Sequence, residues 1–309
     1  MLRSFYSGVS GLKVNQVKLD VIGNNIANVG TTAFKSSRVR FKDMVSQSLT
    51  ESASPGTNLG GINAKQVGLG VQIAGIDTVV GQGTMQPTSR NLDVAIDGEG
   101  YLVVAKGTTA ATVNLDSSSK VTGGSAGTEI SYTRDGALIK DDAGNLVTSD
   151  GARVMGYAVD ATTSKATSTT ALMPLSIPDT AGTPAQKVTS FTIAKNGVIS
   201  AVLADGSISA LGQIAMASFS NPEGLKKTGD NLYQSTSNSG TAVVRSGNGA
   251  TTDNSSGYGD VLQGVLEMSN VDLSEQFTDM IIAERAFQAS GKSITTGDEI
   301  LQDLIGLKR

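Results

Sequence analysis

The chain has 309 residues, of which 39% are hydrophobic, 4% are aromatic and 37 are glycine, and its net charge is −4. It contains neither cysteine nor histidine, which excludes disulfides, thiol catalysis, Ser-His-Asp triads and nearly all zinc sites. We therefore expect no metal and no cofactor. The slightly acidic net charge gives no electrostatic footprint for nucleic acid, so we expect no nucleic-acid partner either.

Residues 1–28 are predicted to form a helix with one narrow seam. The seam residues recur at alternating three- and four-residue steps, the spacing of the a and d positions of a coiled coil. They are Leu2, Phe5, Val9, Leu12, Gln16, Leu19, Gly23 and Ile26. Polar residues interrupt every apolar run, so we expect no cleaved secretory signal here and no membrane-spanning segment anywhere in the chain.

Residues 29–70 are expected to form an extended linker. Val39 to Phe41 alternates like a strand, whereas Lys42 to Leu49 is compatible with one or two helical turns. Residues 51–66 have the Gly, Pro and Ser content of an extended or mobile segment.

Residues 71–264 are predicted to form a mainly antiparallel β domain with a small surface insertion at about 160–187. Tyr101 to Val104 has the continuous apolar character of a short buried strand. Five X-Gly pairs are of the kind that closes two-residue hairpins. They are Asp97-Gly98, Asp135-Gly136, Asp150-Gly151, Asn196-Gly197 and Asp205-Gly206. Residues 108–128 are interpreted as a long hairpin loop.

Three acidic residues of this domain could be read as a catalytic group. Asp93, Asp97 and Glu99 lie close together in the sequence, and glycoside hydrolases use paired carboxylates. No aromatic sugar-stacking surface accompanies them, so we interpret them as turn acids. Gly68 to Gly70 does not complete a dinucleotide fingerprint, and residues 141–145 lack the Gly and Glu of a calcium loop. We therefore expect a protein that is not an enzyme.

Residues 265–309 are predicted to contain a second helix, with Ser269 or Asn270 as its N-cap and Asp272 in its first turn. Its seam has the same steps as the first. The seam residues are Phe277, Met280, Glu284, Phe287, Gly291, Ile294, Asp298, Leu301 and Ile305.

Several a positions of the two seams are polar or glycine. Such positions cost stability and commonly fix register or partner number. They favour packing among many chains, and the alternative is a surface helix with a narrow apolar stripe. The predicted fold class is α+β, with terminal helices that form an intra- and intermolecular coiled-coil layer around a β middle domain. We expect the termini of an isolated monomer to be disordered.

The terminal motifs resemble those of a known family. Ser7 to Leu12, Leu19 to Asn28 and Gly30 to Lys35 resemble the N-terminal signature of bacterial flagellar rod and hook proteins. Leu266 to Leu273 and Met280 to Ala289 resemble the C-terminal signature. The resemblance assigns signature roles to Asn24, Asn25, Ala27, Asn28, Phe34, Lys35, Ser269, Asn270, Val271 and Arg285.

The resemblance implies a structural subunit that polymerises with copies of itself into a helical tube. Residues 36–45 and the opening residues look more like the hook member, a flexible joint that transmits torque and houses the export channel. The alternative is the distal rod member, a straight drive shaft, because the chain is short and its insertion at about 160–187 is too small for the large outer domain of many hook proteins. Residues 51–66 resemble the extra stretch of distal rod proteins and of some hook proteins. Implied partners are rod, hook-cap and hook-filament junction proteins and the type III export apparatus. The implied location is extracellular, in the flagellar hook. An adhesin or a hydrolase would be the alternatives from other classes.

Overall fold

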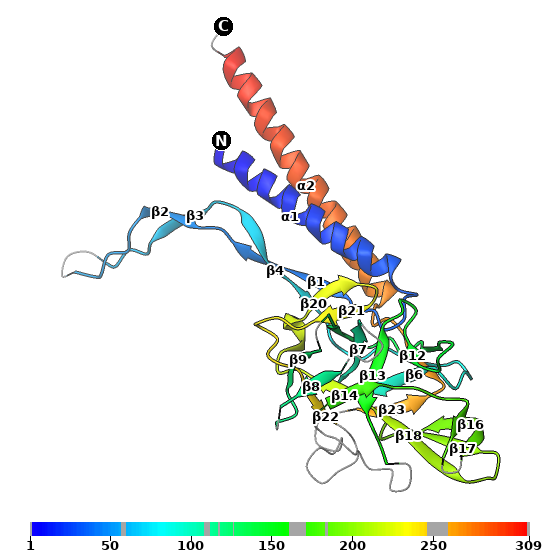
Figure 1. Ribbon diagram of the computed structural model, residues 1–309. Helices are drawn as coiled ribbons and strands as arrows, with labels where there is room; N and C mark the ends of the chain where they lie inside the picture. The colour runs from blue at the N-terminus through cyan, green and yellow to red at the C-terminus, as the bar shows by residue number, and fades with distance from the viewer. Residues whose placement is uncertain are drawn as a thin grey trace. The chain divides into compact units, whose positions relative to one another are not determined.

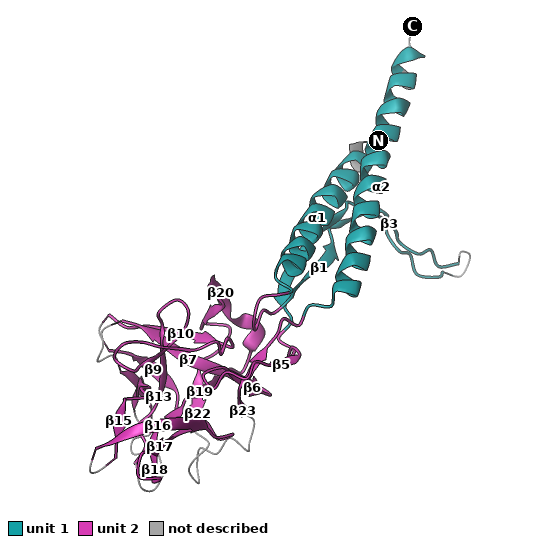
Figure 2. Cartoon of the chain, turned by 90° about the vertical axis from the view of Figure 1, so that its right-hand side faces the viewer, with its two compact units in different colours: residues 1–29, 36–79, 271–309 teal, residues 30–35, 80–270 magenta. Residues whose placement is uncertain are grey.

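A computed structural model describes residues 2–56, 60–107, 112–116, 118–125, 127–160, 171–182, 185–245 and 259–307. The chain divides into two compact units, coloured separately in Figure 2. Unit 1 comprises residues 1–29, 36–79 and 271–309, and unit 2 comprises residues 30–35 and 80–270. The expected linker 29–70 is therefore divided between the units, because residues 30–35 pack with the β domain and residues 36–70 pack with the helices.

The described part of unit 1 forms two helices and four strands, which Figure 1 labels. They are α1 (Leu2–Ala27), α2 (Leu273–Gly306), β1 (Ser37–Asp43), β2 (Ser46–Thr50), β3 (Lys65–Gly68) and β4 (Val71–Thr78).

The two helices of unit 1 lie side by side in opposite directions (Figure 1). Near one end, Gly8 and Gly11 of α1 face Ser290 and Ile294 of α2. A Cβ atom at Gly8 would lie 3.0 Å from Ile294 Cγ1. Near the other end, Lys18 Nζ lies 3.1 Å from Asp279 Oδ1. Small residues thus allow the helix backbones to approach closely, and the contact buries few large side chains.

The N-terminus of α2 differs from the prediction. Asp272 itself is the N-cap, and its carboxylate accepts hydrogen bonds from the backbone N–H groups of Ser274 and Glu275. Asp is as good an N-cap as Ser or Asn, so composition alone did not distinguish the three positions. At the end of α1, the Asn28 side chain donates to the Asn24 carbonyl, which satisfies a terminal acceptor.

The strands of unit 1 form two antiparallel pairs. β1 pairs with β4, and β2 pairs with β3. Residues 46–50 are therefore extended, and the expected helical turns at 42–49 are absent. Ser46, Ser48 and Thr50 favour strand pairing over a helix that would bury no apolar face.

The described residues of unit 2 form short strands and one 3₁₀ turn, η1 (Pro222–Gly224). The strands before the middle of the unit are β5 (Met85–Pro87), β6 (Val94–Asp97), β7 (Tyr101–Lys106), β8 (Val113–Leu115), β9 (Val121–Gly124), β10 (Glu129–Thr133), β11 (Ile139–Lys140), β12 (Leu146–Val147), β13 (Arg153–Tyr157) and β14 (Ala171–Pro174). The later strands are β15 (Thr180–Ala181), β16 (Gln186–Ile193), β17 (Val198–Leu203), β18 (Ile208–Ile214), β19 (Met216–Ser218), β20 (Lys226–Gly229), β21 (Leu232–Gln234), β22 (Val243–Arg245), β23 (Asp260–Gln263) and β24 (Val265–Glu267).

The largest sheet follows the order β15-β16-β17-β18-β13-β7-β10-β21-β20, with further strands branching from β13 and β7. Two small pairs stand apart from this sheet, β6 with β23 and β5 with β24. Every described pairing is antiparallel, so terminal helices around an antiparallel β middle confirm the α+β class.

The core of unit 2 lies on both faces of β7. Leu102 and Val104 join one apolar cluster, while Tyr101, Val103 and Ala105 join the other. A strand buried on both faces needs a continuous apolar run, which explains why residues 101–104 were recognisable in the sequence. The second cluster includes Tyr132 and Phe219, whose ring centroids lie 4.8 Å apart in an edge-to-face arrangement.

Three of the five predicted X-Gly hairpins join paired strands. The turns at Asp150, Asn196 and Asp205 connect β12 to β13, β16 to β17 and β17 to β18. The prediction was wrong at Asp97, because β6 pairs with β23 and not with β7, and at Asp135, because β10 does not pair with β11.

The two Ser/Thr-rich stretches contain more structure than expected. Within 108–128, β8 and β9 pair, and Val113 and Leu115 are buried. Within 160–187, β14 pairs with β8 and β13, and Leu172 is fully buried. These apolar pairs are too short to give a period-2 signal. Residues 161–170 lie outside the described residues.

The tyrosines of the second cluster predict alkaline unfolding of unit 2. Burial raises the pKa of Tyr101 and of Tyr132 to about 12. A phenol whose folded pKa is raised contributes stability that is complete below its ordinary pKa of about 10 and is lost as pH rises from there. The pKa values of Lys35 and Lys227 are lowered by desolvation, so these two groups add stability as pH rises, but only until the unfolded lysines also lose their protons at about pH 10.5. We expect the tyrosinate absorbance to increase and the β-sheet circular dichroism signal to decrease in the same transition, near pH 12.

Exposed Tyr6 provides the control for that titration, because its side chain is 71% exposed. Tyr6→Phe should leave the cooperative transition unchanged. Ionisation of all tyrosines without loss of the circular dichroism signal would contradict the prediction.

Candidate assembly surface and connecting segments

Most of the predicted seam residues lie beside the contact between α1 and α2, but Phe5 and Ile294 take part in it, because the Phe5 ring faces Gly297 and the Ile294 side chain faces Gly8. Half-buried seam residues are Phe5, Leu12, Leu19, Ile26, Met280, Gly291, Ile294 and Leu301. Exposed seam residues are Val9, Gln16, Gly23, Phe277, Glu284, Phe287, Asp298 and Ile305. The side chain of Leu2 lies outside the described residues.

The contact itself uses a neighbouring stripe of each helix. On α2 the stripe is formed by Ala283, Ala286, Ser290, Ile294, Gly297 and Leu301. With 3.6 residues per turn, the predicted α2 seam is centred about 70° around the helix from this stripe. The two share Ile294 and Leu301, so the seam is only partly covered within the chain.

Apolar side chains flank the buried stripe of α2 on both sides. Ile282 and Ile300 lie about 80° to one side of its centre, and Phe287 and Ile305 about 60° to the other. Ile282 is 56% exposed and Ile305 is 68% exposed. A single neighbouring helix covers only one stripe of α2. Both flanks of that stripe therefore remain accessible to other molecules.

A groove of about 440 Å³ runs along α1 in unit 1. Its walls are the apolar side chains Val14, Val17, Val71 and Ile73 together with parts of polar neighbours. Ser10 Oγ accepts a hydrogen bond from Val71 N, which fixes β4 against α1 at one end. The groove adds to the uncovered apolar surface of unit 1.

Asn25 is the most constrained residue of the N-terminal signature. Its amide donates to the Ser37 carbonyl and to Gln276 Oε1, and its Oδ1 accepts from Ser37 N. The side chain is 1% exposed. It thus behaves like a strand partner for the first residue of β1 and joins the three segments of unit 1.

The other signature residues have different surroundings. Asn24, Ala27 and Arg285 are exposed, whereas Lys35 and Ser269 are buried. Phe34, Asn28 and Val271 are half-buried. Asn270 donates from its side chain to the Gly81 carbonyl.

Lys35 belongs to a buried ionic cluster in unit 2. Lys35 Nζ lies 2.6 Å from Glu267 Oε1, and Arg134 Nε lies 3.1 Å from Glu267 Oε2. All three side chains are at most 3% exposed. The arginine contact is poorly aligned, so Arg134 Nε and Glu267 Oε2 interact as charges and not through a well-formed hydrogen bond.

Backbone groups complete the cluster. Gly83 N donates to Glu267 Oε1, Lys35 Nζ donates to the Gly81 carbonyl, and Arg134 donates to the carbonyls of Ile96 and Gly98. Burial lowers the pKa of Lys35, and its hydrogen bond to Glu267 opposes this effect while nearby Arg134 adds to it. Glu267 is therefore the partner that offsets part of the desolvation cost of Lys35.

The three acidic residues considered for hydrolysis do not converge. Asp93 is buried beside Arg90, with 3.5 Å between Asp93 Oδ1 and Arg90 Nη1, while Asp97 accepts from Gln82 and Glu99 is exposed. Asp141 accepts from the backbone N and the side-chain amide of Asn145, as a turn does. Among the described residues, no group of three acidic side chains could hold a metal ion.

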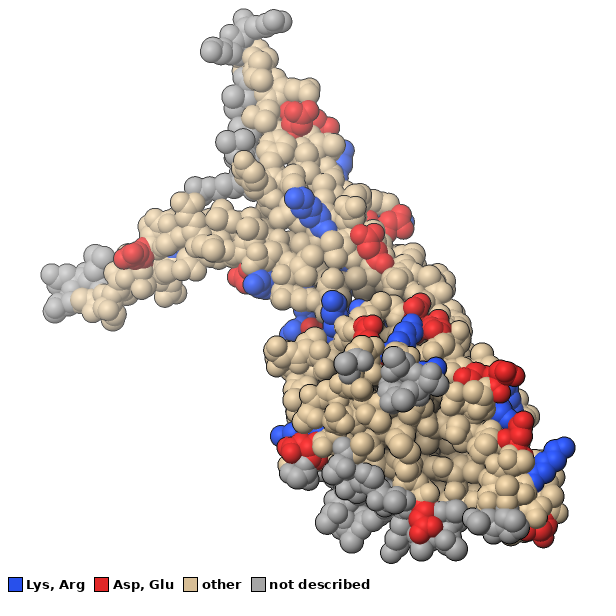
Figure 3. Space-filling model, viewed as in Figure 1, with Lys and Arg blue, Asp and Glu red and all other residues tan. Residues whose placement is uncertain are grey.

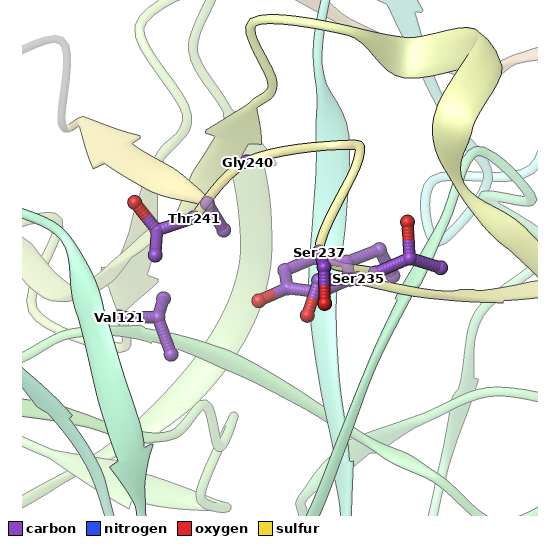
Figure 4. A pocket seen from close by; sticks show the side chains of 8 residues that line it. Val121, Ser235, Ser237, Gly240 and Thr241 are labelled. Atoms are coloured by element: carbon purple, nitrogen blue, oxygen red, sulfur yellow. The ribbon is translucent and has the colours of Figure 1, made fainter.

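A pocket of about 220 Å³ lies beside Tyr132 in unit 2. Figure 4 shows Ser235 and Ser237 on one side of it and Thr241 and Val121 on the other. None of its eight lining residues carries a charge. Its lining has hydroxyl groups but no carboxylate or amine that could act as a general acid or base.

Charged side chains of both signs are mixed over the described residues on the face of the molecule that Figure 3 shows. Within the described residues, neither helix is both long and apolar enough to cross a membrane.

Sequence reasoning did not assign a role to Glu267 or Arg134, although Glu267 lies in the quoted motif Leu266 to Leu273. The available signal was a lone charge inside an apolar or strand context, Leu266-Glu-Met268 and Tyr132-Thr-Arg134. A charge in such a position is seldom buried unless it is paired.

Three family models match the chain. Residues 5–35 match the flagella basal body rod protein model, and residues 120–201 match the flagellar hook protein FlgE/F/G D1 domain. Residues 262–307 match the flagellar basal body rod FlgEFG protein C-terminal model.

Full-length relatives agree. The chain is 45% identical over 309 residues to the flagellar basal-body rod protein FlgG of Bacillus subtilis, covering 100% of both chains. It is 31% identical over 447 aligned positions to the flagellar hook protein FlgE of Borreliella burgdorferi, again with 100% of both chains covered. The crystal structure of Helicobacter pylori FlgE2 aligns with a TM-score of 0.24 at 14% identity, over 69% of this chain and 48% of that chain, which is too weak to support an argument. The sequence matches show that this chain belongs to the flagellar rod and hook protein family, a family of axial structural proteins of the flagellum.

Proposed function

We propose that this chain is a rod subunit that polymerises with copies of itself into a helical tube. Full-length identity of 45% to a rod protein, against 31% to a hook protein, favours the rod over the hook. The hook alignment extends over 447 positions, so that relative carries inserted residues that this chain lacks. The main expectation from the sequence, a hook subunit, is thus less well supported than its alternative.

The exposed apolar flanks of α2 carry the polymerisation proposal. Burying a large aliphatic or aromatic side chain contributes about 1.5–3 kcal/mol, so several such residues on both flanks supply enough free energy for contacts with more than one copy. The seam residues named above would lie in these contacts. Because the two flanks differ, the contact is heterologous, and a heterologous contact that does not close produces a filament.

The remaining proposals follow the family. The chain would act structurally and not as an enzyme, and its partners would be neighbouring axial proteins and the flagellar export apparatus. Neighbours would include further rod proteins and, beyond the rod, hook-cap and hook-filament junction proteins as parts of the same axis. It would be exported without a cleaved signal peptide.

A charge on the flank of α2 should block polymerisation without unfolding the monomer. Ile282→Asp places a carboxylate on a side chain that is 56% exposed, so the monomer should lose less than about 0.5 kcal/mol of unfolding free energy. The critical concentration for polymerisation should rise about 10- to 100-fold, the equivalent of one lost apolar contact. Sedimentation and electron microscopy of purified protein measure it.

Ile208→Asp is the matched control, because Ile208 lies on β18 of unit 2 and is 70% exposed. It should polymerise like the unchanged protein. An unchanged critical concentration for Ile282→Asp would show that this flank is not an assembly surface.

Location distinguishes rod from hook. Basal bodies isolated from cells and labelled with antibody against this chain should carry the label on the straight segment inside the envelope. A strain that lacks the chain should build no hook, because the hook would have no rod to stand on. Label on the curved external segment would restore the hook assignment while leaving the polymerisation proposal intact.

A further inference from the structure

The buried ionic cluster joins parts of the chain that are far apart in sequence. Lys35 comes from residues 30–35, Arg134 follows β10, and Glu267 ends β24. Lys35 and Glu267 are 232 positions apart. The cluster therefore exists only when both ends of the segment forming unit 2 have come together.

The backbone around Glu267 is held from two sides. Glu267 pairs with Met85, and Met268 N donates to the Thr84 carbonyl. On the other side, Ala33 N donates to the Glu267 carbonyl. Gly83 lies so close to Met268 that a Cβ atom at position 83 would collide with the Met268 carbonyl oxygen, so only glycine fits there.

The charges of the cluster are unequal. Two cations, Lys35 and Arg134, share one carboxylate, and none of the three side chains is more than 3% exposed. Lys227 Nζ donates to the Lys35 carbonyl, but Lys227 is an exposed residue and not a member of the buried cluster. Without Glu267, closing unit 2 would bury two unpaired cations, which is strongly unfavourable.

We propose that Glu267 is a folding lock, so that the sheet around β7 closes only when residues 265–270 deliver this carboxylate. Without residues 265–270 in place, the sheet around β7 does not fold. The lock therefore couples the N-terminal and C-terminal connecting segments of unit 2 to a single folding step. It goes beyond the proposed assembly function and does not depend on it.

Pulsed hydrogen exchange during refolding of the full chain tests the order of events. Amides of β7 (Tyr101–Lys106) and of β24 (Val265–Glu267) should become protected with the same rate constant. Protection of β7 at least tenfold faster than β24 would overturn the proposal, because the sheet would then close before the carboxylate arrives.

Variants separate the charge from the packing. Glu267→Gln keeps the shape but leaves both cations unpaired, and it should raise the unfolding equilibrium constant by about 100-fold or more. The combined variant Lys35→Met, Arg134→Met and Glu267→Met removes all three charges. It should refold with β7 protected before β24.

Asp179→Asn is the matched control, because it removes an exposed ion pair of unit 2 in which Asp179 Oδ1 lies 2.8 Å from Lys140 Nζ. It should change neither the equilibrium nor the order of protection. A triple variant that folds with the same order as the unchanged protein would overturn the proposal. If the triple variant does not fold, the exchange order of the unchanged protein alone decides.

Discussion

The Glu267 carboxylate joins the connecting segments of unit 2. Glu267 accepts from Lys35 and from Gly83 N and faces Arg134, so it organises residues 30–35, 80–83 and 265–270 together. The chain passes between the units at the ends of these segments. Apolar packing could hold them only loosely, because it is not directional. A buried ion pair instead specifies one partner and one register, although it adds little net stability.

Unit 1 uses polar and small residues where a self-sufficient domain would use large apolar ones. Its described buried apolar residues are Val14, Ile22 and Ala283, whereas the buried cores of unit 2 surround β7 on both faces. Gly8 and Gly11 allow the backbones of α1 and α2 to approach, and Gly297 leaves space for the Phe5 ring. Unit 1 thus keeps its large apolar side chains on the outside of the helix pair, where neighbouring copies would cover them.

The helices and their periodicity could be read from the sequence because a 3–4 spacing is a strong signal over more than 20 residues. The side of the helix that packs within the chain could not, because Gly8, Gly11, Ser290 and Gly297 carry no hydrophobic signal. Apolar periodicity therefore identified a stripe that the chain leaves partly open. Similarly, β7 was recognisable from its continuous apolar run, whereas β8 and β14 were too short to recognise.

The buried polar residues mark the limit of sequence reasoning in this chain. Asn25, Lys35 and Glu267 look like surface residues by type, yet each is at most 1% exposed. Their burial is tolerable only because their partners are distant in sequence: Ser37 and Gln276 for Asn25, and each other for the ion pair. A sequence motif identifies such residues, but it does not show which hydrogen-bonding or charged groups pair with them. Because these contacts form only in the folded chain, they leave the unfolded chain polar at the segments that must later meet.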